Sequence, residues 1–179
     1  MLICEDTVLV VIDVQGKLAQ LMHEKEALFE NLRLMIQGAK ILDVPILWTE
    51  QYPKGLGPTV PEIAELLPDI QPISKTAFSC CREDTFNQAF AELGREQALL
   101  VGIETHICVW QTTHDLLASE YDVHVVADAV SSRSLDNKQI ALKRMRDVGA
   151  EITCVETALF ELMRVAEGPR FKEVSKLIK

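Results

Sequence analysis

Short apolar runs alternate with amphipathic windows along the whole chain. The runs rich in β-branched residues predict strands at residues 7–13, 45–49, 97–102, 123–127 and 150–153, with a weaker strand at 70–74. Residues 8–12 (VLVVI) are apolar without alternation. That pattern is typical of a strand covered on both faces, and it indicates a parallel sheet.

The amphipathic windows predict helices between these strands. In the first window, apolar residues recur at helical spacing at Leu28, Leu32, Met35, Ile36 and Ala39. Further windows predict helices at residues 84–93, 108–119, 136–148, 157–165 and 171–178. Strands that alternate with helices at this spacing form βαβ units with right-handed crossovers. The chain is therefore predicted to be a single doubly wound, Rossmann-like α/β domain over residues 1–179.

Composition and charge narrow the function classes. With 179 residues, 48% hydrophobic and 25% charged, the chain has the make-up of one globular domain. Its net charge of -9 disfavours nucleic-acid binding, and its longest wholly apolar run is too short to span a bilayer. No signal peptide is visible, and five cysteines, an odd number, favour a reducing compartment. We expect a cytoplasmic protein without a membrane or nucleic-acid partner.

The predicted sheet indicates where a site should lie, because ligands of such folds bind beyond the carboxyl ends of the strands. Asp13 and Gln15 follow the first strand, Lys75 follows the third, and Cys108 follows the fourth. The longest predicted irregular stretch, residues 50–61, also leaves this edge. No glycine-rich phosphate-binding sequence opens a helix, so no nucleotide cofactor is predicted.

Each of these residues also has a plainer interpretation. Asp13 could cap a helix, Lys75 could be solvated, and Cys108 could be a core thiol. The functional interpretation places Cys108 near a helix N-terminus, which would lower the pKa of its thiol. A nearby Lys75 ammonium would act in the same direction.

The three segments that carry these residues are 9–15 (LVVIDVQ), 73–79 (ISKTAFS) and 102–109 (GIETHICV). Together, and in their spacing, they resemble the isochorismatase-like cysteine hydrolases over nearly the whole chain. Residues 51–57 (QYPKGLG) and 131–134 (SSRS) are similar to the isochorismatase domain-containing subgroup.

The resemblance implies a six-stranded parallel sheet of order 3-2-1-4-5-6 with helices on both faces. It also implies an Asp-Lys-Cys triad that cleaves a small amide or ureide through a thioester. Cys108 would attack the carbonyl carbon, Asp13 would act as general base and then acid, and Lys75 would hold the carboxylate. A non-proline cis peptide would fall at Ile103–Glu104, and the backbone N–H groups of Glu104 and Cys108 would form an oxyanion hole. Homo-oligomers are common in this family, so we expect one here.

Two departures from related enzymes refine this expectation. Nicotinamidases of the superfamily carry an Asp-x-His metal motif after the second strand, where this chain has Gln51 and Pro53. We therefore expect no metal, no cofactor and a substrate other than nicotinamide. True isochorismatases cleave a vinyl ether and lack the cysteine, so Cys108 favours C–N hydrolysis.

Residues near the ends of strands could line the pocket for a small-molecule substrate: Gln15, Trp48, Tyr52, Phe78, His106 and Trp110. Core packing is an equal alternative for Trp48 and Trp110, and a hydrogen-bonded surface position is the plainer one for His106. Arg133 could bind a substrate carboxylate, but a loop in which Ser134 caps the next helix is preferred.

Two other function classes remain open from the sequence. One is a binding or scaffold protein that kept the pocket and lost catalysis. The other is a thiol-redox role that pairs Cys108 with Cys80 or Cys81, although adjacent cysteines are usually two separate thiols.

Overall fold

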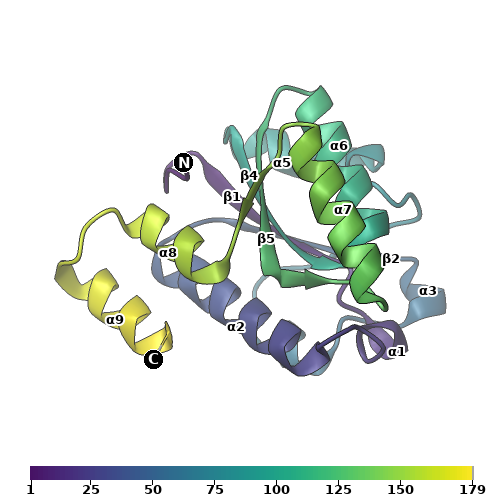
Figure 1. Ribbon diagram of the computed structural model, residues 1–179, viewed down its shortest axis with the longest axis horizontal. Helices are drawn as coiled ribbons and strands as arrows, with labels where there is room; N and C mark the ends of the chain where they lie inside the picture. The colour runs from purple at the N-terminus through teal and green to yellow at the C-terminus, as the bar shows by residue number, and fades with distance from the viewer. Residues whose placement is uncertain (179) are drawn as a thin grey trace.

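A computed structural model describes residues 1–178 and places a parallel sheet between two layers of helices (Figure 1). The strands are β1 (Thr7–Ile12), β2 (Ile46–Gln51), β3 (Ile73–Lys75), β4 (Gln97–Ile103), β5 (Asp122–Ser131) and β6 (Glu151–Thr153). Their order is β3-β2-β1-β4-β5-β6, and all neighbouring pairs are parallel. The doubly wound α/β architecture expected from the sequence is thereby confirmed.

The helices between and after these strands differ widely in length. They are α1 (Gly16–Ala19), α2 (Lys25–Ile41), α3 (Pro53–Leu56), α4 (Pro61–Ala64), α5 (Asp84–Glu92), α6 (Trp110–Ala118), α7 (Leu135–Asp147), α8 (Val155–Met163) and α9 (Gly168–Ile178). A 3-10 turn, η1 (Cys80–Arg82), precedes α5, and a π-helical turn, η2 (Thr105–Val109), precedes α6. Among residues 1–178 there is no helix with the length and apolarity needed to cross a membrane.

The two faces of the sheet build two separate cores. Leu9 and Val11 of β1 pack with α2 and α8 on one face, whereas Val8, Val10 and Ile12 pack with α5, α6 and α7 on the other. Figure 1 shows α2 and α8 on one side of the sheet and α6 and α7 on the opposite side. The unbroken apolar run of β1 is thus explained, because alternate side chains serve opposite cores.

The one-turn helices were absent from the sequence prediction. The stretch 50–61, predicted to be irregular, contains α3 and continues into α4. A single turn contains too few residues to show a helical period in the sequence. The ends of these turns are instead held by hydrogen bonds to distant parts of the chain. One of these is an isolated bridge between Gln15 and Thr59, which ties the stretch to the end of β1.

Gly102 brings β4 unusually close to β1. Its φ is +115°, and a Cβ atom built there would lie 2.1 Å from the carbonyl oxygen of Ile12. Only glycine fits such a conformation at that separation. Because Asp13 follows Ile12 and Glu104 lies two residues after Gly102, this contact fixes where two functional loops leave the sheet.

Candidate active site

Three side chains predicted from the sequence meet at the carboxyl edge of the sheet. Asp13 follows β1, Lys75 ends β3, and Cys108 lies in η2 after β4. Measured over the whole residue, their exposed fractions are 2%, 2% and 6%. Asp13 has a φ of +53°, a left-handed conformation that Asp tolerates better than most residues.

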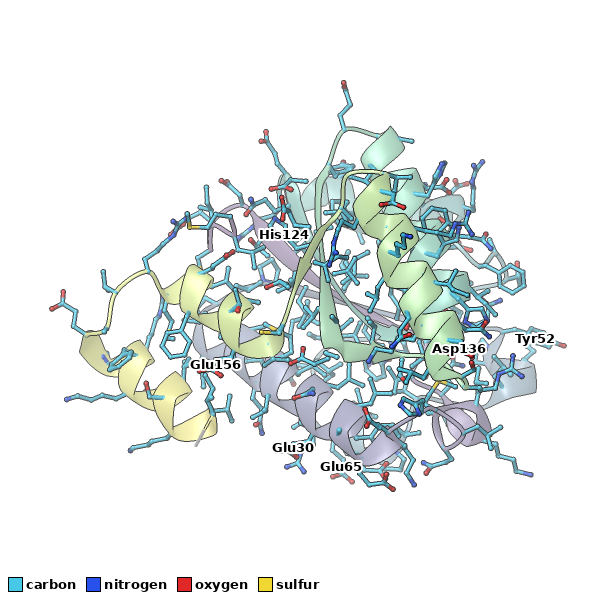
Figure 2. The ribbon with its side chains drawn as sticks, in the orientation of Figure 1. Glu30, Tyr52, Glu65, His124, Asp136 and Glu156 are labelled. Carbon is cyan, nitrogen blue, oxygen red and sulfur yellow. The ribbon has the colours of Figure 1, made fainter. Side chains whose placement is uncertain are left out.

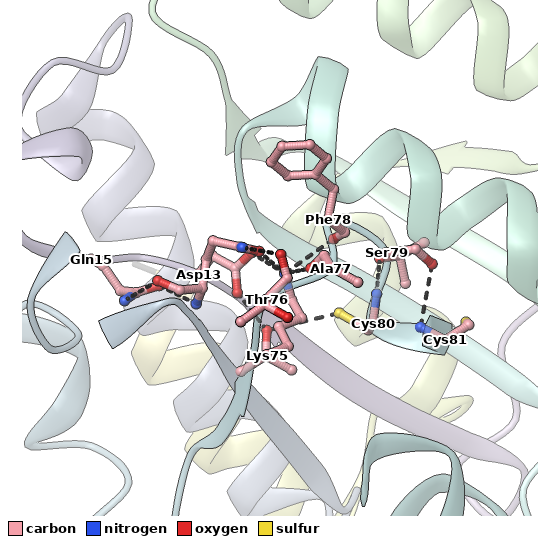
Figure 3. Close-up of polar contacts among 12 residues, drawn as sticks. Asp13, Gln15, Lys75, Thr76, Ala77, Phe78, Ser79, Cys80 and Cys81 are labelled. Atoms are coloured by element: carbon pink, nitrogen blue, oxygen red, sulfur yellow. Dashed lines mark hydrogen bonds and ion pairs between the residues drawn. The ribbon is translucent and has the colours of Figure 1, made fainter. Parts of the chain in front are cut away.

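Lys75 and Asp13 form a buried ion pair, part of the network drawn in Figure 3. Lys75 Nζ lies 2.6 Å from Asp13 Oδ2, and it also donates to Gln51 Oε1 at 2.8 Å and to the carbonyl oxygens of Ala77 and Phe78 at 3.2 and 3.0 Å. Burial is the largest single influence on the pKa of Lys75 and lowers it, but the charge of Asp13, the thiols of Cys80 and Cys108 and the hydrogen bond to Asp13 together outweigh burial and leave that pKa raised. The ammonium is therefore the resting state, and its polar partners offset its burial.

The second carboxylate oxygen of Asp13 is held by Thr49. Thr49 Oγ1 donates to Asp13 Oδ1 at 2.8 Å, and the Asp13 backbone N–H donates to the Thr49 carbonyl at 3.2 Å. The Cys80 thiol lies 3.8 Å from the same hydroxyl. Because the only hydroxyl proton of Thr49 goes to Asp13, Cys80 must be the donor in that contact.

The thiol of Cys108 is neutral at rest, contrary to the expectation of a lowered pKa. Burial, the charge of Asp13 and a hydrogen bond with that carboxylate raise the pKa of Cys108 well above its ordinary value, and Lys75 opposes them only in part. The physical reason is the position of Cys108 within η2, which begins three residues earlier and buries the sulfur. Asp13 thus faces a protonated thiol, the arrangement of a base and its proton donor.

The loop before Cys108 is fastened to the loop after β5. The Ile103–Glu104 peptide is cis, as the resemblance implied. Glu104 is 5% exposed, and its Oε2 accepts from both the backbone N–H and the Nε of Arg133 at 3.1 Å. His106 Nδ1 lies 2.9 Å from Ser132 Oγ, which supports the hydrogen-bonded alternative for this histidine. Ser134 caps α7 by accepting from the Asn137 N–H, as predicted.

Two of the predicted pocket residues lie at the surface beside Lys75. Tyr52 and Phe78 are 54% and 52% exposed, and Tyr52 projects outward near α3 (Figure 2). Tyr52 also lines a pocket of about 300 Å³ together with Lys75 and Glu83. Both aromatic rings are therefore available to a ligand that approaches this edge.

Three other residues predicted for the pocket make contacts within the fold. Gln15 is fully buried and holds backbone groups of Gln51 and Gly57. Trp48 is 6% exposed and donates to Thr59 Oγ1 at 2.8 Å within the core. Trp110 stacks under the guanidinium of Arg144, 4.0 Å from its ring centroid, between α6 and α7. The side chains of β2 alternate, so Trp48 faces one core while Thr49 faces the site.

The structure also gives contacts at this edge to residues for which the sequence predicted another role or none. Thr49 and Gln51 contact Asp13 and Lys75, Cys80 contacts Thr49, and Arg133 holds Glu104 in the loop before Cys108. Gln51 stands where nicotinamidases have a metal ligand, and here its amide oxygen accepts a hydrogen bond from Lys75. Among residues 1–178, no three His, Cys, Asp or Glu side chains converge as a metal would require.

Comparisons with known proteins identify the family of this chain. The sequence model of the Isochorismatase domain matches residues 7–157. The secreted isochorismatase effector Isc1 of Phytophthora sojae is 43% identical over 99% of this chain and 87% of its own length. Isochorismatase domain-containing protein 2A of Mus musculus is 43% identical, with 98% and 84% covered.

A solved structure gives the same result in three dimensions. The MAR1 ribonuclease of Caenorhabditis elegans superposes with a TM-score of 0.91 at 42% identity, covering 99% of this chain and 91% of that one. The family model, the sequence similarity and the fold together establish that the chain belongs to the isochorismatase family.

Proposed function

We propose that this chain is a metal-independent cysteine hydrolase that cleaves a C–N bond of a small amide or ureide through a thioester. The observation that carries the proposal is the buried Lys75–Asp13 pair, whose carboxylate holds the proton of the Cys108 thiol. The proposal assigns Asp13 as the base, Lys75 as its cationic partner and Cys108 as the nucleophile, and the burial of all three residues supports it.

The raised pKa of Cys108 determines how the first step proceeds. Asp13 removes the thiol proton as the sulfur forms its bond with the carbonyl carbon, so no free thiolate accumulates beforehand. The proton then passes from Asp13 to the leaving nitrogen as the C–N bond breaks, and the acyl group stays on sulfur. A water molecule, deprotonated by Asp13, then attacks the thioester carbon; the C–S bond breaks to release the acid, and Asp13 returns the proton to the sulfur of Cys108.

Charge develops on the substrate oxygen during both steps. We expect the backbone N–H groups of Glu104 and Cys108 to face that oxygen, because Glu104 immediately precedes η2 and Cys108 lies within it. The buried Glu104 side chain contributes by fixing this turn to Arg133. Removal of one oxyanion donor typically lowers kcat by about 10²–10³.

Burial of the triad favours a small substrate. Only 6% of Cys108 is exposed, which suits a compact acyl group better than a polymer. The relative from Caenorhabditis elegans bears the name ribonuclease, but the net charge of -9 disfavours a polyphosphate ligand here. A homo-oligomer and a cytoplasmic location complete the proposal, although the relative from Phytophthora sojae is named a secreted effector.

The thiol-redox alternative has less support. Cys80 is fully buried, and burial raises the pKa of its thiol to about 11. All five cysteines are free thiols. A protonated thiol without access to solvent reacts slowly with oxidants.

The deciding experiment measures ammonia release from a panel of small primary amides and ureides. Intact-mass spectrometry during turnover should show an acyl adduct that peptide mapping assigns to Cys108. The Cys108→Ala variant should lose both signals with an unchanged circular dichroism spectrum, whereas Cys154→Ala should keep them. Undiminished turnover in Cys108→Ala would exclude the mechanism. Cleavage of an RNA oligonucleotide without amide turnover would replace the amide or ureide hydrolase with a ribonuclease.

A further inference from the structure

We propose that Gln51 is a positioning residue for this reaction: its side-chain amide oxygen aims the Lys75 ammonium at the Asp13 carboxylate. The inference rests on the proposed hydrolase function, and it assigns a part of the site that lies outside the triad.

The placement of Gln51 follows from strand register. Gln51 of β2 pairs with Lys75 of β3, so the two side chains leave the sheet on the same face. Lys75 must reach across β2 to meet Asp13 at the end of β1, because β2 lies between their strands. Gln51 is the residue it passes, and the Gln51 Oε1 accepts from Nζ at 2.8 Å.

The amide of Gln51 is fixed in one orientation. Its Nε2 donates to the Thr76 carbonyl at 2.7 Å while its Oε1 faces the ammonium. A flipped amide would place its NH2 group against Lys75 Nζ and its oxygen against a carbonyl oxygen. Both contacts would be repulsive, so the Thr76 carbonyl and the Lys75 ammonium together require the amide oxygen to face Lys75.

The backbone of Gln51 is held just as firmly by Gln15. The Gln51 N–H donates to Gln15 Oε1 at 2.6 Å, and Gln15 Nε2 donates to the carbonyls of Gln51 and Gly57 at 3.1 and 2.7 Å. Contacts therefore run from Gln15 to Gln51, then to Lys75, and back to Asp13, two residues before Gln15. This closed ring joins three strands and leaves the ammonium little freedom.

The neutrality of this acceptor matters as much as its position. Of the four acceptors around Lys75 Nζ, Asp13 provides the only carboxylate. The other titratable groups that act on Lys75 are the thiols of Cys80 and Cys108. A second carboxylate at position 51 would share the ammonium with Asp13 and make Asp13 easier to protonate. The neutral amide of Gln51 accepts a hydrogen bond from the Lys75 ammonium but does not compete with Asp13 for its positive charge.

The test compares Gln51→Glu and Gln51→Met with the unmodified protein, using the amide or ureide that gives turnover. Gln51→Glu should move the acidic limb of the kcat/KM profile upward by about one pH unit, because a like charge raises the pKa of the base. Gln51→Met should lower kcat by about tenfold, a loss typical of removing an outer hydrogen-bond partner, with KM nearly unchanged. Gln88→Met and Gln88→Glu are matched controls: Gln88 donates to Glu92 Oε1 on the exposed face of α5, and its substitution should leave both parameters unchanged.

A second measurement tests the role of Gln51 even if the protein does not have the proposed hydrolase activity. The iodoacetamide alkylation rate of Cys108 against pH requires no turnover, and Gln51→Glu should slow it by adding negative charge to the site. A slowed alkylation in a protein that hydrolyses nothing would support the positioning role and exclude the hydrolase. Superimposable pH profiles and alkylation rates for Gln51→Glu and the unmodified protein would overturn the inference. If Gln51→Met fails to fold, the isosteric Gln51→Glu variant carries the test.

Discussion

Lys75 Nζ lies 2.6 Å from Asp13 Oδ2, and the two side chains are 0% and 2% exposed. The pair connects the edge strand β3 with the central strand β1 across β2. Both charges are almost fully buried, so each depends on the other for its compensation.

Removal of the cation should therefore destabilise the fold as well as abolish activity. Lys75→Met leaves the Asp13 carboxylate buried and unpaired, and we expect a loss of about 3–5 kcal/mol in the free energy of unfolding. Urea titration measures this loss. Arg82→Met is the control, because Arg82 is 72% exposed in its pair with Asp115 and its removal should change stability by at most about 1 kcal/mol. Equal effects of the two substitutions would contradict the assigned role of the buried pair.

Asp13→Asn should separate thiol reactivity from catalysis. The substitution removes the charge and the hydrogen bond that raise the pKa of Cys108, and it leaves Lys75 to favour the thiolate. We expect the pKa of Cys108 to fall and its alkylation to become faster at mildly alkaline pH, while hydrolysis is lost. Peptide-resolved alkylation across pH measures this, with the exposed Asp136→Asn as control. An unchanged or higher thiol pKa would show that Asp13 does not hold the proton.

Thr49 supports the same carboxylate from its other oxygen, so its hydroxyl should matter for kcat. Thr49→Val keeps the shape but removes the donor to Asp13 Oδ1, and leaving an acceptor unpaired costs about 1–3 kcal/mol. We expect a kcat reduced about tenfold, with recovery in Thr49→Ser. Thr7→Val tests for a merely structural effect, since Thr7 is equally buried at the opposite end of β1 and bonds to Ile3 and Gln97. A similar loss of kcat in both valine variants would contradict the role of Thr49.

The buried thiols should make the fold sensitive to alkaline pH. Burial raises the pKa of Cys80 from its ordinary 9.0 to about 11, so the folded protein keeps this proton to a higher pH than the unfolded chain does. The stabilising contribution is complete below about pH 9 and is lost between there and about pH 11, by about 1.4 kcal/mol per pH unit. Urea unfolding at neutral and alkaline pH should show a shallower decline for Cys80→Ser than for the unmodified protein. Cys154→Ser is the thiol-removal control, and identical slopes for all three would refute the assignment.

The strands and the position of the site were predictable because both depend on local sequence. Apolar runs identified β1, β2 and β4, and a residue that follows a strand in a parallel sheet must lie at its carboxyl edge. The partners of those residues were not predictable. Thr49 and Gln51 meet Asp13 and Lys75 only through the register of three strands, which no local pattern encodes.

The electrostatic state of Cys108 was also beyond sequence reasoning. Its position after β4 indicated a thiol with a lowered pKa, but the sign depends on burial and on the approach of Asp13 from another strand. The role of Trp110 was ambiguous for a related reason. Its partner Arg144 lies on a different helix, so stacking and pocket lining could not be distinguished from spacing alone.

The close approach of Gly102 to Ile12 has a consequence for how this sequence can vary. The loops that carry the base and the nucleophile depart from two backbones in direct contact, and every replacement at position 102 adds at least one carbon where 2.1 Å is available. In a saturation library selected for turnover, glycine alone should survive at this position. The exposed Tyr52 stands at the other extreme, because its ring meets solvent and side chains of other sizes have room there.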